Sequence, residues 1–213
     1  MADASAALGR AHGFTAQGSI IEGSRRTELT LIDASPSPVD LSFTLGRTMA
    51  QLVRARGGSY FRANRVFWTA HAGARAANLA DRWIEIPLTS SRSFTASLGS
   101  LAPATLARCL GEDHGTLSIA GKITIEHRRA ILVKDAGDAP GSSPGVLAVA
   151  ATGTPYPLAY TATGGQRAGG RIDFCNQGKA DTTRGTITFD NFGRVPPVTP
   201  PANPLRLAQP PSI

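Results

Sequence analysis

The sequence is poor in the residues that usually bind metals, with two cysteines and four histidines among 213 residues. Cys109 and Cys175 belong to no C-x-x-C pair, and no second histidine stands at ligand spacing from His114, which follows Glu112 and Asp113. We therefore predict neither a metal nor a cofactor. The four histidines are interpreted as structural or solvent-facing: His12, His71, His114 and His127.

Long hydrophobic runs are absent as well, which excludes a transmembrane helix. No secretion signal pattern is seen, because Met1 to Asp3 lead directly into an Ala-rich helical pattern. A hydrophobic content of 41% with only 17% charged residues argues against a disordered protein and for one sizeable core. If the protein is exported, we expect this sequence to be its mature domain.

Lysine is scarce, with 3 lysines against 19 arginines in a chain of net charge +7. The basic residues are scattered almost singly, and the only pairs are Arg25-Arg26 and Arg128-Arg129. Neither a dense basic helix nor an aromatic RNA-binding motif is found, so we predict no nucleic-acid partner. A basic surface would instead suit an anionic envelope surface or lipid head groups.

The sequence is rich in turn residues, with 23 glycines and 15 prolines separating short runs of Val, Ile, Thr and Phe. Residues 39 to 45 alternate apolar and polar side chains, which is typical of a strand buried on one side. A Gly57-Gly58 turn predicts a hairpin. Strand-like runs occur over residues 14–21, 27–32, 39–45, 48–56, 59–63, 117–125, 130–133, 146–150, 158–162, 171–175 and 186–192, and we interpret the pattern as a meander of about ten short strands.

Helices are expected over residues 3–11 and 73–82, and after a cap at Ser100. The last helix would have Pro103 in its first turn and end at Gly111. We predict an α+β, mainly β fold: an open, curved antiparallel sheet, or half-barrel, with short helices on its concave face. Residues 1–195 would form a single domain, and residues 196–213 a Pro-rich tail that is extended or disordered.

One motif raises an enzyme hypothesis, because Gly141 to Gly145 matches the G-x-S-x-G pattern with Ser143 as its nucleophile. That motif needs a strand before it and a helix after it. Here Asp135 to Pro140 indicates a loop, and the strand-like Val146 to Ala150 follows. We interpret the motif as a Gly/Pro/Ser turn and predict that the protein is not an enzyme.

The two cysteines allow two interpretations. In an extracytoplasmic protein Cys109 and Cys175 would pair, closing a loop of about 65 residues and stabilising the fold by about 2 to 4 kcal/mol. Otherwise they are two unrelated buried thiols.

Several segments in order resemble a known family. They are Tyr60 to Asn64, Phe67-Trp68, the stretch Leu79 to Ile84 followed by Pro87, and the later segments 115–121, 146–150, 153–158 and 187–197. This pattern resembles the LolA/LppX-like superfamily of envelope lipid and lipoprotein carriers, and specifically mycobacterial-type lipoproteins. The resemblance spans roughly residues 5 to 200.

The resemblance implies an unclosed half-barrel with a hydrophobic cavity that binds acylated molecules. We expect an exported, monomeric carrier whose partners are an acylated lipid or lipoprotein and the envelope membrane. The carrier would have a lipid anchor only if an N-terminal segment precedes this sequence. The alternative is an envelope scaffold with a filled core and a basic surface that binds anionic polymer or a partner protein. The expected cavity-lining residues are Leu41, Phe43, Tyr60, Phe67, Trp68, Leu79, Trp83, Leu106 and Leu110.

Overall fold

The computed structural model describes residues 1–34, 39–55, 58–86, 103–112, 114–172 and 178–207. Twelve strands are present in these ranges: β1 (Phe14–Glu22), β2 (Arg25–Asp33), β3 (Val39–Leu45), β4 (Thr48–Ala55), β5 (Gly58–Ala63), β6 (Ile84–Ile86), β7 (Leu117–Ile125), β8 (Arg128–Asp135), β9 (Gly145–Ala150), β10 (Pro157–Ala162), β11 (Arg184–Asp190) and β12 (Leu205–Arg206). The helices are α1 (Ala2–Gly9), α2 (Arg65–Ala72), the 3-10 helix η1 (Gly73–Arg75), α3 (Ala76–Leu79) and α5 (Pro103–Glu112).

All twelve strands belong to one curved sheet that does not close into a barrel, in the order β12-β6-β5-β4-β3-β2-β1-β11-β10-β9-β8-β7. The two halves of the chain meet at its centre, where β1 pairs with β11 and Thr15 lies opposite Asp190. Neighbouring strands are antiparallel except β12 and β6, which are parallel. The predicted open sheet with helices on one face is confirmed.

The alternation of apolar residues explains which face of the sheet is covered. Across four strands, Leu31 lies opposite Leu41, Leu41 opposite Leu52, and Leu52 opposite Phe61. These side chains form one apolar row, and they belong to the same hydrophobic cluster as Phe14. The helices lie over this face, which we call the helix-covered face.

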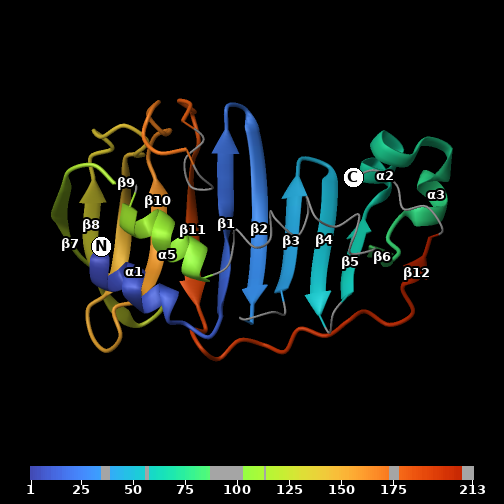
Figure 1. The fold of residues 1–213 in the computed structure, drawn as a ribbon, viewed down its shortest axis with the longest axis horizontal. Helices are drawn as coiled ribbons and strands as arrows, with labels where there is room; N and C mark the ends of the chain where they lie inside the picture. The colour runs from blue at the N-terminus through green and yellow to red at the C-terminus, as the bar shows by residue number, and fades with distance from the viewer. Residues whose placement is uncertain (35–38, 56–57, 87–102, 113, 173–177, 208–213) are drawn as a thin grey trace.

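The helices stand at two ends of the helix-covered face (Figure 1). Helices α1 and α5 cross the strands β8 to β11, whereas α2, η1 and α3 lie at the β5–β6 end. The Ser5 hydroxyl donates a hydrogen bond to the Ala107 carbonyl over 2.7 Å, which ties α1 to α5. Pro103 begins α5, as predicted, and the helix ends one residue beyond Gly111.

The helix expected from residue 73 has different bounds. The helical region already begins at Arg65, so Phe67 and Trp68 lie in α2. Asn64 is the reason, because its side chain accepts a hydrogen bond of 3.1 Å from the Phe67 amide and caps the helix. The Ala-rich stretch then forms η1 and α3.

The described part of the Pro-rich tail is extended along the end of the sheet and adds β12, whose Leu205 lies opposite Ile84. The domain boundary at residue 195 stays a prediction. The cap at Ser100, Pro87, the Gly57 side of the hairpin turn and most of the strand expected over residues 171–175 lie outside the described residues.

Candidate ligand pocket

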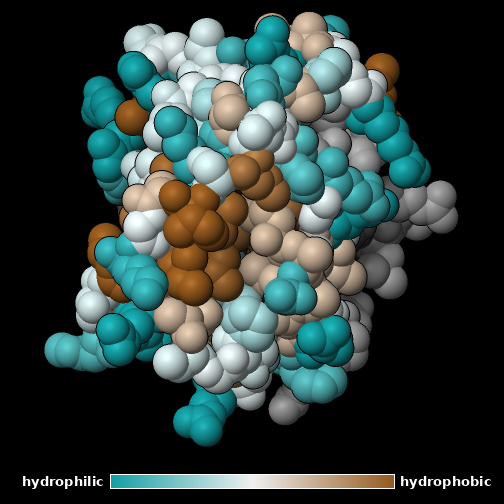
Figure 2. Space-filling view, turned by 90° about the vertical axis from the view of Figure 1, so that its left-hand side faces the viewer, coloured by the Kyte–Doolittle hydropathy of each residue, from teal (hydrophilic) through white to brown (hydrophobic). Residues whose placement is uncertain are grey.

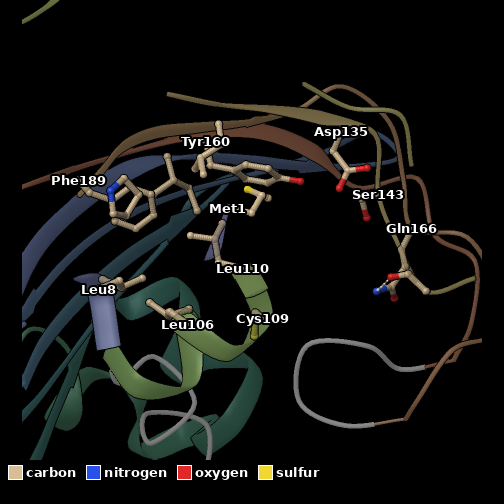
Figure 3. Close-up of a pocket in the computed structure, with 14 residues that line it drawn as sticks. Met1, Leu8, Leu106, Cys109, Leu110, Asp135, Ser143, Tyr160, Gln166 and Phe189 are labelled. Carbon is tan, nitrogen blue, oxygen red and sulfur yellow. Dashed lines mark hydrogen bonds between the residues drawn. The ribbon is translucent and has the colours of Figure 1, made fainter. Parts of the chain in front are cut away.

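A pocket of about 290 Å³ lies between α1, α5 and the helix-covered face of the sheet (Figure 3). Most of its wall is apolar, and it is lined by Met1, Leu8, Leu106, Cys109, Leu110, Leu147, Pro157, Ile187 and Phe189. The helices supply one wall and the strands the other. An apolar pocket with a few polar groups is the usual form of a small-molecule site.

Local geometry explains how these side chains meet. Leu106 and Leu110 are four residues apart on α5, so both point to the same side of the helix. On the sheet, Leu147 of β9 lies opposite Tyr160 of β10, and Tyr160 lies opposite Ile187 of β11. Three strands therefore place one side chain each in a row facing α5.

One end of the pocket is polar and contains Asp135, Ser143, Tyr160 and Gln166. Asp135 ends β8 and is only 5% exposed. Its Oδ1 atom accepts hydrogen bonds from the amides of Gly115, over 2.9 Å, and Gly137, over 2.8 Å. These two donors keep the carboxylate fixed beside the pocket.

Ser143 lies on the loop that joins β8 to β9, and a neighbouring loop holds that segment in place. The Gln166 side-chain amide donates to the Gly141 carbonyl over 2.8 Å, and the Arg167 amide donates to the Ser142 carbonyl over 2.9 Å. These bonds fix residues 141–142, which directly precede Ser143.

Tyr160 remains a neutral phenol at ordinary pH. Burial raises the pKa of Tyr160 above its usual value of 10.0, and the charge of the nearby Asp135 raises it further. Gly145 gives the ring space, because a Cβ atom there would lie 2.9 Å from the tyrosine hydroxyl. The ring is thus positioned across β9 by packing.

The structure brings only some of the predicted lining residues to this pocket. Leu106 and Leu110 line it. Phe67, Trp68 and Leu79 are buried in the main hydrophobic cluster, against which Leu41 and Phe43 also pack.

Tyr60 neighbours the inward Phe61 on β5 and so points to the opposite face of the sheet. Trp83 is half-buried, with the Arg62 guanidinium 4.9 Å from its ring centre. Seven of the predicted lining residues thus lie outside this pocket, and their role as ligand contacts stays a prediction.

The sequence analysis missed most of the sheet wall of the pocket. Leu147 belongs to a strand that was predicted, and Ile187 and Phe189 lie in another. What was missing was the pairing that brings β9, β10 and β11 together under α5. The alternation of Ile187 and Phe189 was the available signal for a common face.

The G-x-S-x-G segment has the local structure expected of a turn. Residues 136–144 form a loop, and β9 starts at Gly145, where a nucleophile elbow would continue into a helix. Within the described residues, no group of three or more His, Cys, Asp or Glu side chains could hold a metal ion. In the same part of the chain, no helix has the length and hydropathy needed to cross a membrane.

A larger hollow of about 520 Å³ lies on the opposite face, over β11, β1, β2 and β3. Its lining is mainly polar and includes Thr30, Thr44, Thr186, Thr188 and Glu28. Hydroxyl and carboxylate groups do not suit an acyl chain, so we take the pocket under α1 and α5 as the candidate site.

The β7 edge of the molecule is apolar at its surface. Ile119 is 69% exposed, and Ile123 on the same strand is also exposed. Figure 2 looks at this side and shows hydrophobic side chains gathered there among polar ones. Exposed apolar side chains in a group are a common feature of contact surfaces.

Cys109 is half-buried in α5 and lines the candidate pocket. Cys175 lies outside the described residues, so the predicted disulfide between them stays a prediction.

No family model matches the sequence, and no curated protein is similar to it. Solved structures are similar in fold. The Mycobacterium tuberculosis lipoprotein LppX matches with a TM-score of 0.52 and 9% identity, over 92% of this chain and 94% of LppX. LprF from Mycobacterium bovis matches with a TM-score of 0.50 and 10% identity, over 93% and 92% of the two chains. At these identities the likeness concerns the fold, and the chain therefore has a LolA/LppX-like fold.

Proposed function

We propose that the protein is an exported lipid-binding carrier that shields an acyl chain in the pocket between α1, α5 and the sheet. The observation that supports this most is the apolar wall formed by α5 and three strands around about 290 Å³. Ligand pockets usually measure about 300 to 1,000 Å³. The pocket volume lies just below that range, and so it suits one acyl chain rather than several.

The proposed partners follow from the surface. The net charge of +7 favours binding to an anionic membrane. The exposed Ile119 and Ile123 would add an apolar contact with that membrane. The ligand would be an acylated lipid or lipoprotein taken from or delivered to an envelope membrane. We place the protein outside the cytoplasm and expect it to act as a monomer.

Lipid binding can be tested by blocking the pocket. The purified protein, freed of lipid by organic extraction and refolded, is titrated with a fluorescent fatty acid. Leu110→Trp adds a large side chain inside the pocket, and we expect it to weaken binding at least about tenfold, which corresponds to about 1.4 kcal/mol.

The matched control is Val66→Trp, which adds a tryptophan at an exposed position of another helix. Equal binding by the two variants would place the lipid elsewhere. Native mass spectrometry of protein from an envelope source should show an adduct that extracts as an acylated lipid.

One observation favours a second candidate, an envelope interaction module. Phe67, Trp68 and Leu79, which were expected to line a cavity, are packed into a closed cluster. A module of this kind would bind anionic polymer through its basic surface. Salt-sensitive polymer binding, with no lipid adduct after incubation with diverse lipids, would favour it.

A further inference from the structure

The polar end of the pocket contains hydrogen-bonding capacity that the protein does not use. The Oδ1 atom of Asp135 accepts two amide hydrogen bonds, but within the described residues its Oδ2 atom accepts none. The residue is nevertheless 95% buried and lines the pocket. This oxygen is not among the fully buried atoms that lack a partner, so it is accessible from the pocket and can accept a hydrogen bond from a ligand that brings a donor.

Two hydroxyl groups lie at the same end. Tyr160 and Ser143 line the pocket, and neither side chain makes a hydrogen bond within the described ranges. Figure 3 shows the Tyr160 hydroxyl pointing toward the end of the pocket where Asp135 and Ser143 lie. A hydroxyl can both donate and accept, whereas a carboxylate only accepts.

The rest of the pocket is apolar, so the pocket has one polar end and one apolar end. Leu8, Leu106 and Phe189 lie at the end away from Asp135 (Figure 3). An amphiphile would place its chain between these side chains and its head beside Asp135. A phosphate or carboxylate head would meet the charge of Asp135, and like charges at short range repel.

We propose that the pocket selects lipids with an uncharged, hydroxyl-bearing head, such as an acylglycerol or an acylated sugar, through Asp135, Ser143 and Tyr160. This proposal rests on the proposed lipid-binding function, since it assumes an acyl chain in the apolar part. Head-group hydroxyls would donate to the free oxygen of Asp135. Ser143 and Tyr160 would complete the hydrogen bonds of the same head group.

The experiment compares four lipids with the same chain: a monoacylglycerol, the free fatty acid, a lysophosphatidate and an alkyl amine. Each competes with a fluorescent alkyl probe for the delipidated protein. We expect the monoacylglycerol to bind at least about tenfold more tightly than either anionic lipid, which corresponds to a difference of about 1.4 kcal/mol in binding free energy.

Asp135→Asn should remove most of that preference, because the amide keeps an acceptor for the Gly115 and Gly137 amides but loses the charge. Tyr160→Phe should weaken monoacylglycerol binding about two- to tenfold, the usual range for one hydrogen bond. The control is Asp40→Asn, where the carboxylate accepts from Gln51 on another strand, and this variant should keep the preference.

Three results overturn the proposal. The first is equal binding of the acylglycerol and the anionic lipids by the natural protein, and the second is an unchanged preference in Asp135→Asn. The third is tighter binding of the alkyl amine, which would assign a cationic head. If the probe still binds and Leu110→Trp blocks it, the lipid-binding function stands while the head-group proposal fails. If neither the probe nor any of the lipids binds, both fail.

Discussion

The two ends of one sheet support their helices in different ways. At the β5–β6 end, Trp68 of α2 is 0% exposed and meets Phe61 edge-on, with ring centres 5.7 Å apart. At the β9–β11 end, α5 presents Leu106 and Leu110 to the sheet, and a pocket remains between them. Aromatic side chains fill the space under a short helix, whereas leucines facing leucine and isoleucine leave part of it open. The same fold can thus contain a closed core at one end and a binding space at the other.

The largest expected effect sharpens this contrast at the filled end. Trp68→Ala should lower the free energy of unfolding by about 3 to 5 kcal/mol, because the surrounding rings cannot collapse into the space. Urea unfolding followed by circular dichroism measures it. Leu106→Ala at the open end should cost only about 1 to 2 kcal/mol, since this side chain already borders a space.

A matched control is Trp68→Phe, which keeps a ring at the same position. The indole nitrogen of Trp68 has no hydrogen-bond partner in the described part of the chain, so its loss removes no bond. Equal costs for Trp68→Ala and Leu106→Ala would contradict the distinction between a filled and an open end.

The next effect concerns how α5 is held at the open end. If Cys109 pairs with Cys175 as predicted, Cys109→Ser should lower the free energy of unfolding by about 2 to 4 kcal/mol. Thiol titration of the unfolded, unreduced natural protein should find no free thiol. Two reactive thiols, together with a cost below about 1 kcal/mol for Cys109→Ser, would show that α5 is held by packing alone.

A smaller effect is expected from the cap of α2. Asn64 accepts from the Phe67 amide, and its own amide donates to the Arg47 carbonyl over 2.7 Å. Asn64→Ala should therefore cost about 1 kcal/mol, and Asn64→Asp less, because aspartate keeps the cap. Thermal unfolding of the two variants provides the measurement. Similar losses for both would mean that the bond to Arg47, rather than the cap, is what stabilises this end.

The sequence predicted the sheet better than the pocket, and the reason is the range of the signals involved. Alternation along residues 39–45 is local, and it correctly indicated a strand with one buried face. The pocket depends on Leu147, Tyr160 and Ile187 meeting across three strands, and nothing within one strand specifies that pairing. The sequence analysis also overlooked the Asn64 cap, which places Phe67 and Trp68 in α2.

The smallest expected effect is a change in acid sensitivity at the open end. Asp138 lies in the loop that carries Ser143, and hydrogen bonds from the Thr116 hydroxyl, over 2.7 Å, and the Thr116 amide, over 2.6 Å, lower the pKa of Asp138 below its usual value of 3.8. A carboxyl group whose pKa is lower in the folded state stabilises the fold above its unfolded pKa. That contribution is lost as the pH falls through the folded value.

Asp138→Asn should therefore lower the urea midpoint slightly near neutrality, where the ionised carboxylate stabilises the fold, and change it little in strong acid, so that the midpoint falls less steeply below about pH 4. The control is Glu22→Gln, which removes an equal charge from an exposed hairpin of the sheet. If both variants follow the acid curve of the natural protein, Asp138 does not anchor the loop. The open end would then depend for its shape on the backbone hydrogen bonds of Arg167 with Gly141 and Ser142.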